Sequence, residues 1–399
     1  MLELSNVAKQ LPYSATRVLV PYAQAAQARG LKVYKLNIGQ PDVAAPKSAI
    51  DAVRNIDLKL ISYPDSHGNA GLLKGMSEYY KGIGINVEPE EIITTVGGSE
   101  AVSIVMGATC NPGDEMIVFE PFYANYLNMA IQHGIKLVPI TTHIEDGFAL
   151  PDMAEVEKKI TPRTKAVLVI NPGNPSGCLY SKEALLELGA IAKKHDLWVL
   201  ADEVYREFCY TDEPHFSCMH IPGLEQNVIL IDSASKRWSL CGTRIGFVVS
   251  HHKDMMNAVL RYAQARLCAP ALGQIAVEGA LKAPQSYYDA TRTEYISRRD
   301  AMLAELRKID GVIAPTPMGA FYAVAQLPVD DSTKFCIWML EHFSHEGWTV
   351  QMTPMGGFYF DAEKGRQQVR LAYVLEKEKL VKAMDILRRG LEAYPGCIK

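Results

Sequence analysis

The sequence predicts an α/β protein in which helices cover a mostly parallel central sheet, joined to a smaller α+β domain. Between about residue 91 and residue 250, short β-rich runs alternate with helical stretches, which is the order that builds such a sheet. Beyond about residue 285 this alternation stops and long helices dominate. The 399 residues allow two or three domains at roughly 100–200 residues each.

The strands of the large sheet are expected at six β-rich runs: residues 92–96, 116–120, 166–170, 197–201, 228–232 and 246–250. Between two of them, Leu185, Leu188 and Ile191 recur at helical spacing. That helix is expected to end in Lys193, Lys194 and His195, because cationic side chains suit a helix C-terminus. Together these segments form a strand, helix, strand unit.

The C-terminal part is expected to contain a long charged helix over residues 287–308 and short strands near 321–324 and 369–373. An amphipathic helix over 376–393 closes the chain. This order predicts a small α+β domain.

The N-terminal residues show little strand signal before 36–38, so we expect an arm and a helix that packs on the small domain. The predicted division is therefore 1–40 for the arm and small-domain segment, 41–284 for the large domain and 285–399 for the small domain.

Composition excludes several classes of protein. Lys and Arg number 41 against 45 Asp and Glu, a net charge of −4 without long charged runs, so neither a nucleic acid nor a membrane surface is an expected partner. The apolar runs are far shorter than the ~20 residues that span a bilayer. Glu3 and Lys9 interrupt the first residues, so no secretory signal is visible and a cytoplasmic location is expected. The eight cysteines form no C-x-x-C pair, and no metal site is expected.

Side chains that could bind or react with a ligand follow the predicted strands directly. In an open parallel sheet, ligands bind beyond the carboxyl ends of the strands, so these positions are the candidates for a site. They are Gly98 and Ser99, Tyr123, Asn174, Asp202 and Tyr205, and Ser233, Ser235 and Lys236.

Lys236 is a candidate for Schiff-base chemistry, because it is an amine at the mouth of the sheet. Taken alone it would be read as a surface lysine, and its neighbours change that interpretation. The Gly97-Gly98-Ser99 stretch before a helix suits an anion, although such a stretch is also common as a tight turn. Arg244 adds a planar fork suited to a phosphate.

Asp202 ends an apolar run, where a buried charge needs a cationic partner. A protonated pyridine nitrogen is such a partner, and Asp202 would then maintain the ring as an electron sink. Tyr205 and Asn174 could donate hydrogen bonds to the oxygen of that ring, and Tyr123 could stack on its face.

With these residues the chain resembles pyridoxal-phosphate-dependent aminotransferases of fold type I, the class I and II family that includes aspartate aminotransferases. Five ordered motifs carry the resemblance, which covers about residues 30–395: residues 171–177, residues 202–205, Ser233-x-Ser235-Lys236, residues 242–246 and residues 369–371. Gly173 and Ser176 differ from the residues common in the family, but both keep the turn.

The resemblance implies that Lys236 forms the internal aldimine with pyridoxal 5'-phosphate and shuttles the proton, and that Asp202 holds the pyridinium. Asn174 and Tyr205 would bind the phenolic oxygen, and Tyr123 would stack on the ring. The implied phosphate ligands are Gly98, Ser99, Ser233, Ser235 and Arg244.

On the substrate side, the resemblance implies that Arg370 binds the α-carboxylate, helped by Asn174 and the backbone near Gly39. Tyr63 resembles the tyrosine that reaches the phosphate of a neighbouring subunit, so a homodimer is expected. No residue clearly matches a ligand for a distal substrate carboxylate. Arg266 and Arg17 are candidates, with a solvated surface arginine as the alternative for both.

The function expected from these features is transfer of the amino group of an L-amino acid, plausibly aspartate, to a 2-oxo acid such as 2-oxoglutarate by a ping-pong mechanism. A carbon-sulfur β-lyase of the same fold is the alternative, because it would use the same Lys236 and Asp202. A cofactor-binding regulator is a third hypothesis. It would need a DNA-binding arm, and only about 30 residues precede the family pattern.

Overall fold

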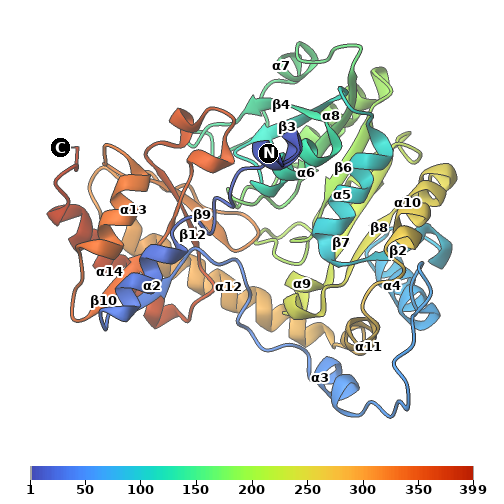
Figure 1. Ribbon diagram of the computed structural model, residues 1–399, viewed down its shortest axis with the longest axis horizontal. Helices are drawn as coiled ribbons and strands as arrows, with labels where there is room; N and C mark the ends of the chain where they lie inside the picture. The colour runs from blue at the N-terminus through green and yellow to red at the C-terminus, as the bar shows by residue number, and fades with distance from the viewer. Residues whose placement is uncertain (1, 399) are drawn as a thin grey trace.

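The computed structural model describes residues 2–398 and has a seven-stranded sheet at its centre (Figure 1). In sheet order the strands are β2 (Ile92–Thr95), β8 (Gly246–Val249), β7 (Val228–Ser233), β6 (Trp198–Asp202), β5 (Thr164–Ile170), β3 (Glu115–Glu120) and β4 (Lys136–Thr141). β8 runs antiparallel to β2 and β7, and every other neighbouring pair is parallel. The mostly parallel sheet and all six expected strands are confirmed.

The sequence interpretation missed β4. Pro139 stands inside this strand and removes a backbone donor, which weakens the strand signal. The sheet tolerates it because β4 is the edge strand and pairs only with β3.

Helices cover both faces of the sheet. In β6, Leu200 packs in one apolar cluster while Val199 and Ala201 pack in another on the opposite face. The first face is covered by α5 (Gly97–Thr109), α6 (Asn125–His133) and α10 (Lys253–Ala265). The second face is covered by α4 (Ala70–Gly82), α8 (Lys182–Lys194) and α11 (Ala271–Ala280).

The helix α8 begins and ends where the sequence predicts. The Ser181 hydroxyl caps its start by accepting a hydrogen bond from the Ala184 amide at 3.1 Å. Lys193 and Lys194 occupy its last turn and His195 follows, so the cations lie at the negative end of the helix dipole.

The smaller sheets lie at the left of Figure 1. One has the order β11 (Thr353–Pro354), β12 (Gln368–Ala372), β9 (Tyr322–Gln326), and the other pairs β1 (Lys32–Lys35) with β10 (Trp348–Gln351) in parallel. The expected strand at 36–38 is wrong. The strand β1 ends at Lys35. The Leu36 amide still donates to the Gln351 carbonyl of β10, but the carbonyls of Leu36 and Asn37 accept hydrogen bonds from Ala372 and Arg370.

The remaining helices complete the small part of the molecule. The expected long and closing helices are α12 (Gln285–Leu306) and α14 (Lys377–Ala393), which pack together, and α2 (Val20–Ala28) lies against α13 (Ser332–Glu341). The domain boundaries at 40/41 and 284/285 stay a prediction. The other helices are α1 (Asn6–Gln10), α3 (Lys47–Arg54), α7 (Met153–Glu157) and α9 (Ala234–Arg237).

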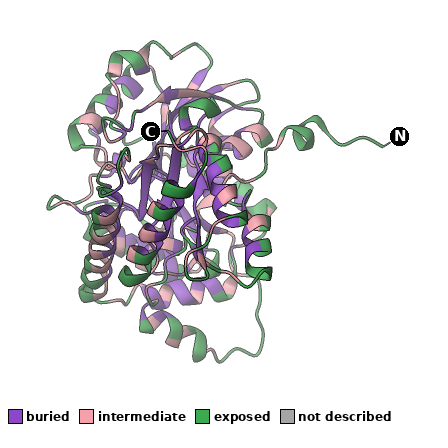
Figure 2. Cartoon of the chain, turned by 90° about the vertical axis from the view of Figure 1, so that its left-hand side faces the viewer, coloured by how far each residue is buried: buried purple, intermediate pink, exposed green. Residues whose placement is uncertain are grey.

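The N-terminal segment projects from the body with most of its residues exposed (Figure 2). Within residues 2–398, none of the helices combines the length and the apolar character that crossing a membrane requires.

Candidate active site

A cavity of about 860 Å³ opens at the edge of the large sheet where β2, β5, β6 and β7 end. The predicted site residues that line it are Gly39, Gly98, Ser99, Tyr123, Asn174, Asp202, Tyr205, Ser233, Ser235, Lys236, Arg244 and Arg370. Tyr63 is the predicted site residue that is not among them, and its side chain is 80 % exposed.

The single reversed strand explains why Arg244 reaches this edge. All strands of the sheet except β8 have their carboxyl ends at the edge where the cavity opens, whereas β8 begins at that edge. Gly246, the first residue of β8, pairs with Thr95 at the end of β2 and with Ser233 at the end of β7. Arg244, two residues before Gly246, therefore lies beside the residues that follow the other strands.

The start of α5 packs closely against Arg244 and Gly246. Gly97 has φ +75°, and a Cβ there would lie 2.3 Å from the Arg244 Nη2 atom. A Cβ on Gly246 would lie 2.5 Å from the Gly97 carbonyl carbon, so both positions require glycine. The first amide groups of a helix have no carbonyl partner within it, so Gly98 and Ser99 bring donors and a positive helix end to the cavity.

Two hydroxyls and a guanidinium complete the same corner. The Ser233 hydroxyl donates to the Ser235 hydroxyl at 3.0 Å, which holds both at the cavity wall. Arg244 donates through Nη1 to the Cys241 carbonyl at 3.0 Å and remains exposed toward the cavity. Helix amides, hydroxyls and an arginine are together suited to bind a phosphate group.

Asp202 also lines the cavity and is buried, with 5 % of its surface exposed. The Tyr126 hydroxyl donates to its Oδ2 atom at 2.6 Å, but no cationic side chain among residues 2–398 pairs with it. Burial therefore raises the pKa of Asp202 to about 6, and the Tyr126 hydrogen bond only partly opposes this. Such a carboxylate is suited to bind a cationic group on a ligand.

Aromatic and amide side chains line the same cavity. The hydroxyls of Tyr205 and Tyr322 are 3.0 Å apart, and burial raises the pKa of Tyr205 well above its usual range, so this hydroxyl stays protonated and can donate. Asn125 donates to the Tyr123 hydroxyl at 2.8 Å, which fixes that ring at the cavity wall. Asn174 Oδ1 accepts from Arg370 at 3.1 Å, so its amide nitrogen is left to donate.

Lys236 stands on the short helix α9 directly after β7. Its Nζ atom donates to the Gly39 carbonyl at 2.9 Å and lies 5.9 Å and 5.8 Å from the ring centroids of Tyr205 and Phe321. This hydrogen bond and the aromatic walls position the amine within the cavity.

Arg370 comes from β12 and faces the same space at 2 % exposure. Its Nη2 atom donates to the Asn37 carbonyl at 2.6 Å, and the guanidinium carbon lies 4.5 Å from the Tyr322 ring centroid. The Arg370 Nε atom is buried without a hydrogen-bond partner among the described residues. A buried guanidinium with an unused donor and no carboxylate partner is suited to bind a ligand carboxylate.

The two candidates for a distal carboxylate differ. Arg266 lies outside the cavity lining, and its guanidinium is already bonded to Glu100 and to the Thr94 carbonyl. The structure therefore disfavours Arg266 as the ligand of a distal substrate carboxylate. Arg17 lines the cavity from the turn before α2.

Sequence reasoning did not identify three residues of the site. Tyr126 lies in the first turn of α6, three positions after Tyr123, which precedes that helix; the two rings meet edge to face with their centroids 5.3 Å apart. Tyr322 and Asn37 come from β9 and from the chain after β1, so only the packing of the small sheets shows their roles. The signal available in the sequence was the repeated tyrosine spacing.

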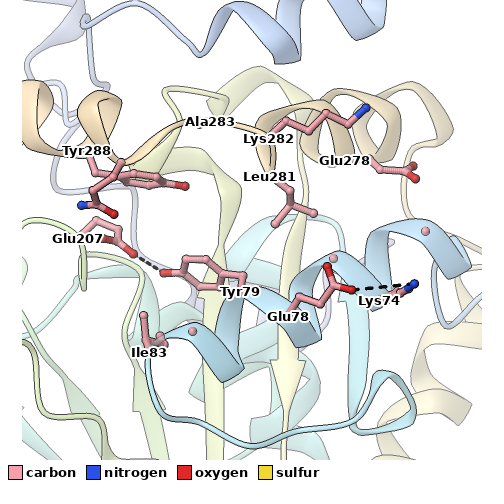
Figure 3. Close-up of a pocket in the computed structure, with 14 residues that line it drawn as sticks. Lys74, Glu78, Tyr79, Ile83, Glu207, Glu278, Leu281, Lys282, Ala283 and Tyr288 are labelled. Carbon is pink, nitrogen blue, oxygen red and sulfur yellow. Dashed lines mark hydrogen bonds and ion pairs between the residues drawn. The ribbon is translucent and has the colours of Figure 1, made fainter.

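A second cavity of about 580 Å³ lies between α4 and the segment that joins α11 to α12 (Figure 3). Three carboxylates, those of Glu78, Glu207 and Glu278, line it against two lysines, Lys74 and Lys282. Glu207 accepts a hydrogen bond from the Tyr79 hydroxyl, and Glu78 faces Lys74 across 4.0 Å. An excess of carboxylates would repel a phosphate, so this cavity does not compete with the first as the active site.

Comparison with known proteins agrees with this geometry. The family model for aminotransferase class I and II matches residues 32–387. A putative aminotransferase of Bacillus subtilis is 31% identical over 97% of this chain and 98% of its own length, and the aspartate/prephenate aminotransferase of Thermus thermophilus is 31% identical over 98% and 99%. Among solved structures, the aspartate aminotransferase from Thermus thermophilus with maleate aligns with a TM-score of 0.88 at 30% identity over 98% of this chain and all of that chain. The alanine aminotransferase from Pyrococcus furiosus aligns with a TM-score of 0.90 at 30% identity over the same shares.

Proposed function

The chain belongs to the class I and II aminotransferase family, and on this premise we propose that it moves the amino group of a dicarboxylic L-amino acid, aspartate first, to a 2-oxo acid such as 2-oxoglutarate. It is an aminotransferase that depends on pyridoxal phosphate. The observation that carries the site assignment is Asp202, a buried carboxylate that lines the cavity without a cationic partner among residues 2–398.

The described residues fit this cofactor. The start of α5 with Ser233, Ser235 and Arg244 suits the phosphate, and Asp202 suits the ring nitrogen. Asn174 and Tyr205 would donate to the ring oxygen, and Tyr123 would stack on the ring. When bound, pyridoxal phosphate supplies the aldehyde that accepts the amino group and a ring that withdraws electrons from the substrate Cα.

Lys236 is proposed as the residue that carries the cofactor and then moves the proton at the substrate Cα. Its amine already lies in the cavity, where the Gly39 carbonyl accepts its hydrogen bond at 2.9 Å. With cofactor and substrate bound, the free amine of Lys236 would serve as the base that takes the proton from the substrate Cα. The hydrophobic rings of Tyr205 and Phe321 beside it limit the access of water.

Arg370 is proposed to bind the substrate α-carboxylate. Its position is fixed by Asn174 and the Asn37 carbonyl, so the carboxylate meets an oriented guanidinium. This holds Cα beside Lys236 and converts proton transfer into a step between positioned groups.

The assembly is proposed to be a homodimer. The loop before Pro64 exposes four apolar side chains, those of Leu58, Leu60, Ile61 and Tyr63. Exposed apolar surface of this extent is typical of an interface. The partner's copy of this loop would then bring Tyr63 to the phosphate-binding residues of the cavity. A cytoplasmic location is proposed as well. Sedimentation equilibrium of the purified protein tests the dimer, and a monomer at micromolar concentration would reject it.

The visible absorption spectrum of the protein with bound cofactor tests the reaction. L-aspartate should deplete the long-wavelength band and 2-oxoglutarate should restore it, since the two halves of a ping-pong transfer are separable. A band that does not cycle would reject this donor. Release of a thiol, pyruvate and ammonia from a cysteine S-conjugate without a keto acid would identify the carbon-sulfur β-lyase instead. Absence of any band after addition of pyridoxal phosphate would reject the site itself.

A further inference from the structure

The charges that line the active-site cavity do not balance once the proposed function is assigned. Four cationic side chains line it, those of Arg17, Lys236, Arg244 and Arg370, against one carboxylate, Asp202. Lys236 serves the cofactor aldehyde, Arg244 the phosphate and Arg370 the α-carboxylate. Arg17 is left without an anion.

The turn that carries Arg17 is fastened to the carboxylate site. The Asn37 side chain donates to the Thr16 carbonyl at 3.2 Å, while the Asn37 backbone carbonyl accepts from Arg370 Nη2 at 2.6 Å. One residue therefore connects both arginines. The Arg17 amide also donates to the Ser14 carbonyl at 2.9 Å, and the following Leu19 is buried, so the turn is anchored on two sides.

The guanidinium of Arg17 is available for a ligand. Its side chain is exposed and makes no hydrogen bond or ion pair with the part of the chain that the structure describes. Arg266 differs, because it lies outside the cavity lining and its Nε and Nη2 atoms already donate to Glu100 and to the Thr94 carbonyl. Arginine presents paired donors that match a carboxylate, so an uncommitted arginine at the cavity wall favours an anionic substrate side chain.

From this geometry we infer that Arg17 binds the side-chain carboxylate of a dicarboxylic substrate while Arg370 binds its α-carboxylate. The inference rests on the proposed function and names the residue that sets its substrate class. Arg17 thus acts in substrate choice, and the chemistry stays with Lys236.

The half-reaction of the cofactor-loaded enzyme with L-aspartate or L-alanine tests this, followed by absorbance without any keto acid. Arg17→Gln should lower the aspartate-to-alanine ratio of kcat/KM about 10- to 100-fold, the range for a hydrogen bond to a charged group. Arg17→Lys should fall between the two, because it keeps the charge and loses the fork. The matched control is Arg54→Gln, which removes an exposed arginine that does not line the cavity and should leave the ratio unchanged.

Binding of unreactive acids gives a second readout. Isothermal titration of the enzyme with succinate should show a Kd about 10-fold weaker or more in Arg17→Gln, with the Kd for propionate unchanged. If the wild type prefers aspartate but Arg17→Gln keeps its ratio within 3-fold, the role of Arg17 is wrong while the proposed function stands. If the wild type prefers alanine and binds succinate no better than propionate, the dicarboxylic substrate class is wrong and the inference falls with it.

Discussion

Two buried aspartates at the ends of neighbouring strands differ in their partners and in the direction of their pKa shifts. Asp202 ends β6 and Asp232 lies near the end of β7, and both are buried. Asp202 receives one hydroxyl, that of Tyr126, and burial raises its pKa to about 6. The same residue type in almost the same position of the sheet becomes a different chemical group one strand away.

Asp232 is fully compensated by the protein. The Arg237 guanidinium forms a buried ion pair with its Oδ1 atom, and the Tyr80 hydroxyl donates to Oδ2 at 2.8 Å. Burial alone would raise its pKa, but the charges of Arg237 and Arg206 hold it below the usual value. Asp232 is therefore a charged structural group.

The difference teaches how to separate a structural carboxylate from a functional one. Burial is common to both, so burial does not distinguish them. The absence of a cationic partner at Asp202 within residues 2–398, together with its place on the cavity wall, marks the carboxylate whose partner is a ligand. Lys236 and Arg237 repeat the contrast, because one amine faces the cavity and the next cation faces Asp232.

The largest effect is expected from Lys236→Ala. Loss of the base should lower kcat by at least about 10⁴-fold, the upper range for a positioned proton-transfer group. The melting temperature of the cofactor-free protein should stay close to that of the wild type, since Lys236 forms a single hydrogen bond there, to Gly39. Single-turnover kinetics and a thermal melt check both. Near wild-type turnover would remove Lys236 from the mechanism.

Asp232→Asn should damage stability instead. It leaves the Arg237 charge buried without its partner, which costs about 3–5 kcal/mol of unfolding free energy. Urea unfolding measures this loss. The contrast with Asp202 fails if the unfolding free energy changes by less than about 1 kcal/mol.

Asp202→Asn should reverse that pattern. Without the carboxylate the ligand cation loses a charged hydrogen bond, and kcat should fall about 100-fold, which corresponds to about 3 kcal/mol. The cofactor-free protein should be no less stable than the wild type above pH 6, because the substitution removes a buried charge that lacks a partner. Activity assays and urea unfolding of the cofactor-free protein give the two numbers. A large loss of stability with intact turnover would make Asp202 a structural residue like Asp232.

The pH dependence of stability sharpens the same contrast. The folded pKa of Asp202, about 6, lies above its unfolded value of about 4, so between these values the native state holds more protons than the unfolded one. Stability of the cofactor-free protein should thus fall as pH rises from 4 to 6, by about 3 kcal/mol for this residue. Asp202→Asn should lack this decline. Equal pH profiles for the two proteins would contradict the raised pKa.

Most of the sheet and of the residues that line the active-site cavity could be predicted from the sequence, because each lies next to a local signal. Asp202, Ser233 and Lys236 stand directly after apolar strand runs, and the edge of a parallel sheet then brings them together. Local patterns were sufficient there.

The compensation of Asp232 could not be predicted in this way. Tyr80 lies 152 residues away and Arg237 reads as one more cation after Lys236. Similarly, the connection of Arg17 to Arg370 runs through Asn37, on three segments far apart in the chain. Which charge meets which partner is decided by packing, and packing separates the two aspartates.

The smallest effect isolates a single hydroxyl on each aspartate. The Tyr126 hydroxyl donates to Asp202 Oδ2 at 2.6 Å, and this hydrogen bond lowers the pKa of the carboxyl group. Tyr126→Phe removes it. The pKa should rise above about 6, and kcat should fall about 3- to 10-fold, since a hydrogen bond contributes about 1 kcal/mol. Because Tyr126 acts through Asp202, the stability of the cofactor-free protein should also continue to decline to higher pH, which a purely structural role would not produce.

Tyr80→Phe is the matched control, because it removes the hydroxyl 2.8 Å from Asp232. It should cost about 1 kcal/mol of stability and leave kcat and the pH profile near pH 6 unchanged. If the two variants behave alike, the two aspartates are not the distinct groups that their partners indicate.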